Sequence, residues 1–70
     1  MRLNVNGEER DCAAGDLAAL WRAETADLEL ASPKGFAVAL NGAVIRRDAW
    51  ATTVLQDGDR VEIIRAMQGG

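Results

Sequence analysis

Only one stretch of the sequence has the spacing of an amphipathic helix, and it is short. In residues 17–24, LAALWRAE, the large apolar side chains stand at positions i, i+3 and i+4, namely Leu17, Leu20 and Trp21. Asp16 precedes them, and an aspartate there caps a helix by accepting hydrogen bonds from its first backbone N–H groups. A helix with a single apolar stripe must bury that stripe against another layer. The rest of the chain is therefore expected to form a sheet.

The residues before the helix have the pattern of a β-hairpin. From position 2 to position 6 polar and apolar side chains alternate, which predicts a strand with Leu3 and Val5 on its inner face. Asn6-Gly7 follows, and this pair tolerates the positive φ angles that both central residues of a type I′ turn require. We expect a return strand that ends near Cys12.

A second hairpin is predicted after an irregular connection that contains the only proline. Residues 36–40, FAVAL, are apolar on both faces, as is typical of a strand in the middle of a sheet. Asn41-Gly42 then predicts a hairpin turn that leads into Val44 and Ile45.

The last part of the chain predicts a bend and a final strand. Residues 46–55 are too short and polar for a further helix, so we expect a bend with a single 3₁₀ turn. Asp57-Gly58 marks a turn, and residues 60–66 form a strand with Val61 and Ile63 on one face.

The predicted order is β-β-α-β-β-β, with the first and last strands side by side as a parallel pair. This is an α+β fold of the β-grasp type, in which a mixed sheet of four or five strands wraps around one helix. We expect residues 1–66 to form this domain and residues 67–70 to form a flexible tail that ends in two glycines.

Composition excludes several classes of function. The 70 residues carry a net charge of −3 without a basic stripe and include three aromatic side chains, so we expect no nucleic-acid binding. The start of the chain is neither a signal peptide nor a membrane span, which indicates a cytoplasmic protein without membrane contact. The absence of histidine removes the commonest metal ligand, and we expect no metal and no bound cofactor.

The chain ends on RAMQGG, and the final Gly70 is a candidate for the working group of the protein. Gly70 has no side chain to obstruct a reagent that approaches its carboxylate. Gly69 keeps the backbone before it narrow and free to adopt positive φ. Together with Gln68 and Met67 these residues form a tail that is suited to threading a narrow channel.

The sequence resembles the ThiS family, the ubiquitin-like sulfur carriers of thiamine biosynthesis. The resemblance rests on the first Asn-Gly pair, on CAAGDLAAL at the start of the helix, on VALNGAVIRRDAWATTVLQDGDRVEIIRA, and on the terminal diglycine. It covers nearly the whole chain. Within the connection that follows the helix, SPKG and the residues just before it are not diagnostic, and neither is AMQ before the glycines.

The resemblance implies a carrier that is acted upon, not an enzyme. An E1-like adenylyltransferase of the ThiF type would use ATP to convert the carboxylate of Gly70 into an acyl-adenylate. Sulfur that a cysteine desulfurase draws from cysteine would then replace the adenylate and leave a thiocarboxylate. A thiazole synthase of the ThiG type would take this sulfur into the thiazole ring.

The outer face of the sheet is the predicted docking surface for these enzymes. A small apolar patch with a polar rim is typical of such a surface. The candidates are Ile64, Ala37 and Ala39 for the patch and Arg2, Arg60 and Arg65, with Glu62, for the rim.

Other interpretations remain open. A carrier for molybdopterin synthesis has the same fold and tail, and carriers for cysteine synthesis or transfer-RNA thiolation are related. A non-covalent ubiquitin-like interaction module with an inert tail is a second class. A small thiol enzyme that uses Cys12 is a third, although a free cysteine is more often a small buried apolar residue. We expect Trp21 and Trp50 to pack in the core.

Overall fold

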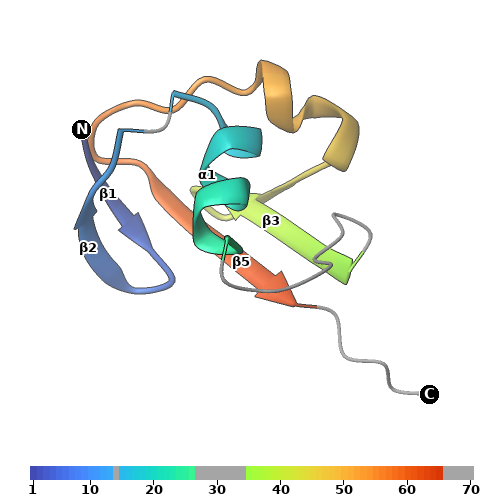
Figure 1. Ribbon diagram of the computed structural model, residues 1–70, viewed down its shortest axis with the longest axis horizontal. Coiled ribbons are helices and arrows are strands. Elements are labelled where there is room, and N and C mark those ends of the chain that lie inside the picture. Colours follow the sequence, from blue (N-terminus) through green and yellow to red (C-terminus); the bar gives the residue numbers. More distant parts are fainter. Residues whose placement is uncertain (14, 27–34, 66–70) are drawn as a thin grey trace.

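The structure is a computed structural model that describes residues 1–13, 15–26 and 35–65. Its elements are, in chain order, β1 (Arg2–Val5), β2 (Glu8–Asp11), α1 (Leu17–Glu24), β3 (Phe36–Leu40), β4 (Ala43–Ile45), the 3₁₀ helix η2 (Arg47–Thr52) and β5 (Arg60–Arg65). Figure 1 shows the α-helix α1 lying across one face of the sheet. The predicted order of strands and helix is confirmed.

The five strands form one mixed sheet in the order β2-β1-β5-β3-β4. β1 and β5, the first and last strands, are parallel, with Asn4 opposite Arg60 and Val5 opposite Val61. The other neighbouring pairs are antiparallel. The expected β-grasp arrangement, including β3 as an interior strand, is therefore confirmed.

Both Asn-Gly pairs turn the chain as predicted. Asn6 and Asn41 have φ angles of 53° and 51°, and the following Gly7 and Gly42 have 86° and 89°. Positive φ at both central residues is the geometry of a type I′ turn, whose twist matches that of the flanking strands. The two turns fix the register of the β1–β2 and β3–β4 hairpins.

Helix α1 begins and ends where the apolar spacing predicts. The carboxylate of Asp16 accepts a hydrogen bond from the backbone N–H of Ala19 at 2.9 Å, so the predicted cap is confirmed. Leu17, Leu20 and Trp21 are buried against the sheet. The helix thus contributes one apolar stripe to the core, and its Arg22 and Ala23 side chains are exposed.

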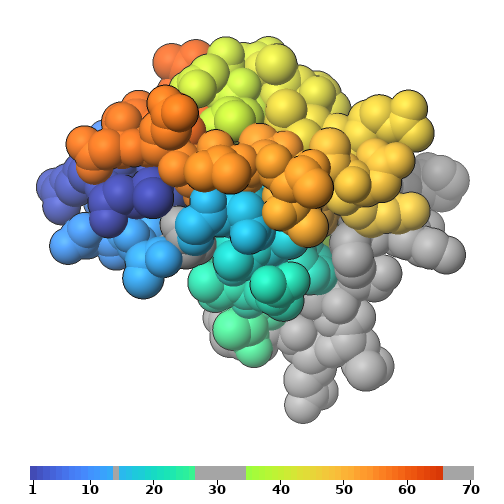
Figure 2. Space-filling view, turned by 90° about the horizontal axis from the view of Figure 1, so that it is seen from above, coloured from blue at the N-terminus to red at the C-terminus, as the bar shows by residue number. Residues whose placement is uncertain are grey.

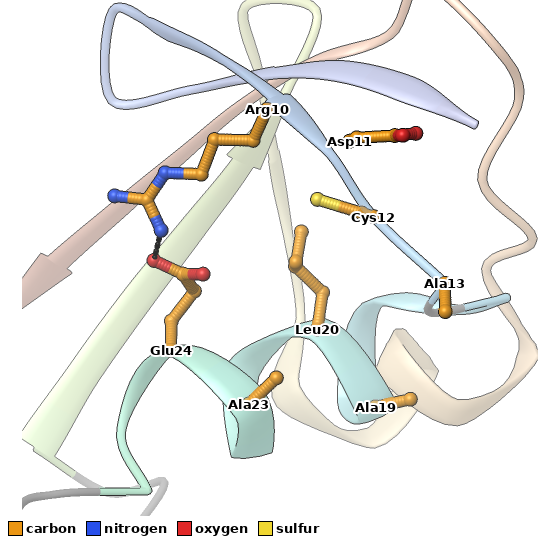
Figure 3. A pocket seen from close by; sticks show the side chains of 8 residues that line it. All are labelled: Arg10, Asp11, Cys12, Ala13, Ala19, Leu20, Ala23 and Glu24. Atoms are coloured by element: carbon orange, nitrogen blue, oxygen red, sulfur yellow. Dashed lines mark hydrogen bonds and ion pairs between the residues drawn. The ribbon is translucent and has the colours of Figure 1, made fainter.

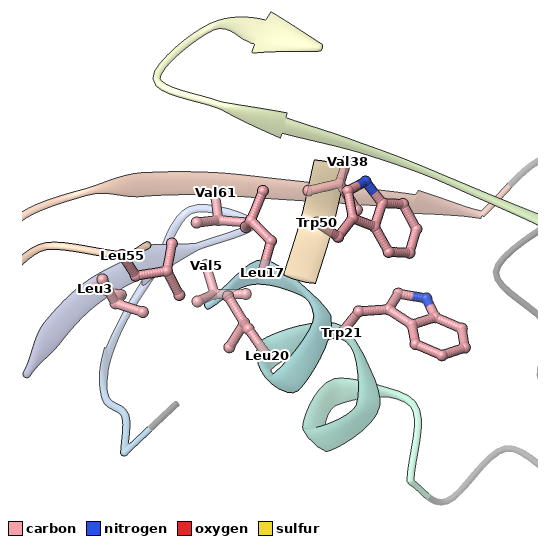
Figure 4. Packing of buried hydrophobic residues seen from close by; sticks show 9 residues of the cluster. All are labelled: Leu3, Val5, Leu17, Leu20, Trp21, Val38, Trp50, Leu55 and Val61. Carbon is pink, nitrogen blue, oxygen red and sulfur yellow. The ribbon is translucent and has the colours of Figure 1, made fainter. Parts of the chain in front are cut away.

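The core lies between the sheet and α1 (Figure 4). It consists of Leu3, Val5, Leu17, Leu20, Trp21, Val38, Trp50, Leu55 and Val61. The rings of Trp21 and Trp50 are 5.9 Å apart, and both are buried, which confirms their predicted role in packing. Trp50 also donates a hydrogen bond from Nε1 to the backbone oxygen of Ile45, so it fastens the end of β4 to the core.

The bend after β4 is more regular than the sequence predicts. Instead of a single 3₁₀ turn it contains a six-residue 3₁₀ helix, η2. The buried ring of Trp50 anchors this helix, and the hydroxyl of Thr53 donates to the backbone oxygen of Ala49 at its end.

Figure 2 shows the segment that includes η2 lying between the β3–β4 hairpin and α1. The backbone N–H of Leu17 reaches the oxygen of Thr53, so this segment covers the start of the helix.

Two predictions concern positions outside the described residues. The irregular connection falls mostly on residues 27–34, and the separate tail falls on residues 67–70. Within the described ranges, no helix is long and apolar enough to cross a membrane.

Candidate functional site

β5 leads directly to the residues that the sequence marks as reactive. Its pairing with β3 continues to Arg65, which stands opposite Phe36, so the ladder reaches the last described residue. Residues 66–70 follow, and fully extended they would span at most roughly 17 Å at about 3.3–3.6 Å per residue. The candidate tail residues Met67, Gln68, Gly69 and Gly70 lie outside the described part of the chain.

The other edge of β5 is held by the first hairpin. The backbone N–H of Asn6 donates to the oxygen of Val61 at 2.9 Å. The Asn6 side-chain oxygen then accepts from the N–H of Ile63 at 2.8 Å, beyond the point at which β1 has turned away. β5 is therefore fixed by neighbours on both sides until two residues before its end.

The predicted apolar patch exists on the outer face of the sheet. Ile64 stands opposite Ala37 in the β3–β5 ladder, and Ala39 follows two residues along β3 on the same face. The Ile64 side chain is 53% exposed, and Ala37 is also exposed. The structure brings these three predicted residues together.

Val44 belongs to the same patch, although sequence reasoning did not select it. It lies in β4 directly opposite Ala39 and is 75% exposed. The sequence contained the information that places Val44 in the patch, because the Asn41-Gly42 turn sets the hairpin register and puts Val44 on the same face as Ala39. We call Ala37, Ala39, Val44 and Ile64 the outer patch.

The predicted rim does not surround this patch. The backbone oxygen of Arg2 accepts a hydrogen bond from the N–H of Gly58, a residue that precedes β5. The Arg2 side chain forms an ion pair with Glu9. At about 3.3 Å per residue, position 58 is roughly 20 Å along the strand direction from position 64. Arg60 lies on the outer face two residues from Glu62, the partner of Ala39, so it borders the Ala39 end of the patch and is four residues from Ile64.

Arg65 lies on the opposite face from the outer patch. It pairs with Phe36, and strand alternation gives it the same side as Val61 and Ile63, which pack toward the helix. The three arginines are therefore spread along the sheet and over both of its faces. Glu62, opposite Ala39, is the charged residue that register places nearest to the middle of the patch.

Among the described residues, none is arranged around Cys12 as a base that would activate its thiol. Its side chain is half-buried, packs against the core, and lies beside Leu20 in Figure 3. The neighbouring Asp11 side chain is 84% exposed and pairs with the N-terminal amine. Histidine is absent from the whole sequence. The geometry thus supports a packing role for Cys12.

The charged groups near Cys12 are already paired with one another. The guanidinium of Arg10 contacts the carboxylates of Glu8 and Glu24, which ties β2 to the end of α1. The pKa of Arg10 is raised above its ordinary value, first by the hydrogen bond with Glu8 and then by the attraction of Glu24. Among the described residues, no group of three or more possible metal ligands gathers anywhere.

Known proteins resemble this chain over its full length. The sequence profile of the ThiS family matches residues 3–70. The sulfur carrier protein ThiS of Escherichia coli strain K12 is 31% identical over 70 residues, which is the whole of both chains.

Two solved structures agree in fold. The crystal structure of thiamine biosynthesis protein ThiS from Geobacter metallireducens has a TM-score of 0.74 and 33% identity, and the match covers both chains completely. The solution structure of a thiamine biosynthesis protein from the same organism has a TM-score of 0.70 and 36% identity, over all of this chain and 88% of that one. With a β-grasp fold and a family match over residues 3–70, this chain belongs to the ThiS family.

Proposed function

We propose that this protein is a sulfur carrier of thiamine biosynthesis and that the carboxylate of Gly70 carries the sulfur. The observation that carries the proposal is the family match, which extends through residue 70 and so includes both terminal glycines. The fold supports it, because the central strand β5 leads straight to these residues. In this proposal the protein acts in the cytoplasm and is a co-substrate of other enzymes.

The chemistry starts from a carboxylate, which is a poor acyl donor. An oxygen of the Gly70 carboxylate attacks the α-phosphorus of ATP on an E1-like adenylyltransferase, and pyrophosphate leaves. Hydrosulfide, with sulfur drawn from cysteine, then attacks the carbonyl carbon, and AMP departs with the oxygen that made the attack. The product is a thiocarboxylate, which a thiazole synthase uses as its sulfur source. ATP binds to the activating enzyme and not to the carrier.

The folded body has the role of presenting the tail. β5 is held by β3 and by the first hairpin, so the point from which residues 66–70 depart is rigid. Fixing the backbone of a peptide segment in one conformation in a partner's channel costs about 1–2 kcal/mol per residue. Contacts made by the body must offset this cost.

We assign those contacts to the outer patch. Ile64 and Ala37 lie at the end of the sheet from which the tail departs, and Val44 extends the apolar area across β4. Burial of apolar surface stabilises a complex by about 25 cal/mol per Å². The patch therefore supplies binding energy at the end of the sheet where β5 ends.

Growth of a bacterial strain that lacks its thiazole-pathway carrier tests the function. The intact chain should restore growth without added thiazole, and the chain without Gly70 should not. Circular dichroism should show that both versions fold alike. The Cys12→Ser variant should restore growth fully, since no step uses the thiol.

A strain that lacks its molybdopterin carrier separates the related functions. We expect that this chain does not complement the loss of the molybdopterin carrier in that strain. Rescue of the molybdopterin strain alone would assign the protein to the other pathway. Rescue of the thiazole strain by the chain without Gly70 would contradict the carrier mechanism.

A further inference from the structure

A groove runs between β2 and α1 on the helix side of the sheet (Figure 3). It is a cavity of about 560 Å³. Ala19 and Ala23, one helical turn apart, contribute small side chains from α1, and Leu20 contributes an apolar one. The Arg10–Glu24 ion pair bridges the two elements beside them. The groove thus combines apolar lining with room for a side chain to enter.

The strand beside this groove has an open edge. β2 is the outermost strand of the described sheet. Met1 and Cys12 donate a backbone hydrogen bond to each other. In an antiparallel ladder every second residue points its backbone N–H and C=O groups at the neighbouring strand, so those of Arg10 point toward β1 as well. The N–H and C=O groups of Glu9 and Asp11 then point away from β1, where no described strand pairs with them.

The charges on this edge decide which occupant it accepts. The side chains of Glu9 and Asp11 lie on the outer face, because Glu9 is opposite Asn4 and strand alternation gives Asp11 the same side. The cation of Arg10 is engaged by Glu8 and Glu24. Glu9 and Asp11 make longer, exposed contacts with Arg2 at 3.6 Å and with the N-terminal amine at 3.7 Å, and such surface pairs are weak enough for a partner's cation to compete with them. A second copy of β2 would bring carboxylates against carboxylates, which disfavours pairing between two copies of this chain. A strand with basic side chains at these positions is complementary instead.

We propose that an extended segment of another protein binds this groove as an added strand beside β2. Residues directly opposite each other in an antiparallel pair share a face. The partner residues opposite Glu9 and Asp11 are therefore lysine or arginine. The residue between them lies opposite Arg10 and turns its apolar side chain into the groove, beside Leu20 and Ala23. The recognised pattern is basic–apolar–basic.

This site is separate from the proposed sulfur chemistry and does not rest on it. β1 stands between β2 and β5, and the groove opens on the helix side, whereas the outer patch faces the other way. A partner in the groove therefore leaves the outer patch and the end of β5 accessible. The same protein could be held by one partner while a second acts on its tail.

Titration of the isotope-labelled full chain with two peptides tests the proposal. The probes are Gly-Lys-Val-Lys-Val-Lys-Gly and the same peptide with glutamate in place of lysine, both with blocked ends. The lysine peptide should shift the amide signals of Glu9 and Asp11 saturably and slow their hydrogen exchange. The glutamate peptide should bind at least about tenfold more weakly, as expected from cross-strand charge pairing. Equal binding of both peptides, shifts confined to the outer patch, or no saturable shift would overturn it.

Variants of the groove give a second measure. Ala23→Leu fills the cavity and should weaken binding of the lysine peptide by about tenfold or more, because it excludes a valine-sized side chain. Ala51→Leu, the same change at an exposed site in η2, should have no effect. The double variant Glu9→Lys with Asp11→Lys should prefer the glutamate peptide. An unchanged preference, or an effect of Ala51→Leu equal to that of Ala23→Leu, would refute the assigned site.

Discussion

The side chain of Asn6 accepts a hydrogen bond from the backbone N–H of Ile63 at 2.8 Å, across a sequence separation of 57 residues. Asn6 has already left β1, and its positive φ belongs to the hairpin turn. One residue therefore turns the first hairpin and also extends the support of the last strand toward its end. This contact links the local geometry of the turn to the rigidity of the strand that leads to Gly70.

Removal of this side chain should loosen β5 locally. Asn6→Gly keeps the positive φ of the turn and deletes the acceptor, so hydrogen exchange at the Ile63 amide should accelerate. The lost hydrogen bond should cost about 0.5–1.5 kcal/mol of stability.

The second hairpin offers a matched control. Asn41 has nearly the same φ, and its side chain accepts from the N–H of Arg60 at 2.9 Å. Asn41→Gly should accelerate exchange at Arg60 and leave Ile63 unchanged. The assignment of the Ile63 contact is wrong if Asn6→Gly leaves exchange at that amide as slow as before.

Among the aromatic residues, Trp50 should reduce the free energy of unfolding most when its side chain is replaced by a smaller one, because it is buried and also donates a hydrogen bond. Trp50→Phe leaves the Ile45 oxygen without its donor, which costs about 1–3 kcal/mol, and it also removes buried volume. Urea denaturation should show this loss. Val54→Ala, at a side chain that is 70% exposed, should change stability by less than about 0.5 kcal/mol. Equal midpoints for the two variants would argue against the anchoring role of Trp50.

The cap of α1 should contribute measurably to stability. Asp16→Ala removes the acceptor of the Ala19 N–H and should cost about 0.5–2 kcal/mol, whereas Asp16→Asn retains an acceptor and should cost much less. Thermal or denaturant unfolding measures both. Asp48→Ala tests a carboxylate that pairs with Arg46 at the surface, and it should change little. If Asp16→Asn is as damaging as Asp16→Ala, the capping bond is not the cause.

The outer patch should matter for the reaction with partner enzymes and not for folding. Val44→Ser combined with Ile64→Ser removes most of its exposed apolar surface, so KM for adenylation of the carrier should rise by about tenfold. The matched change Val54→Ser lies outside the patch and should leave KM unaltered. Steady-state kinetics with the activating enzyme measure the difference. An unchanged KM for the double variant would place docking elsewhere.

Local signals in the sequence predicted most of the fold. Asp16 and the spacing of Leu17, Leu20 and Trp21 defined α1, because capping and periodicity act within a few residues. The two Asn-Gly pairs defined both hairpins, since few other pairs tolerate positive φ at consecutive positions. The extent of η2 was not predicted, because no side-chain cap marks where this 3₁₀ helix begins.

The sequence alone indicated Gly70 as the candidate reactive residue, but it indicated the residues of the docking surface only in part. Arg2 and Ile64 both have the parity of the outer face. Parity gives the face but not the position along it, and the parallel register of β1 with β5 separates the two residues. Val44 was missed although the register that the Asn41-Gly42 turn sets in the β3–β4 hairpin places it opposite Ala39. The groove between β2 and α1 depends on how helix and sheet pack together, and no sequence motif marks it.

The central claim is that sulfur is carried on the carboxylate of Gly70, and intact mass spectrometry tests it most directly. The protein should be produced together with its adenylyltransferase and a sulfur source, and then fragmented to locate any change. The predicted result is a mass gain equal to the exchange of one oxygen for one sulfur, confined to Gly70 and retained in Cys12→Ser. An unmodified C-terminal fragment under these conditions, or sulfur found on Cys12 instead, would contradict the account.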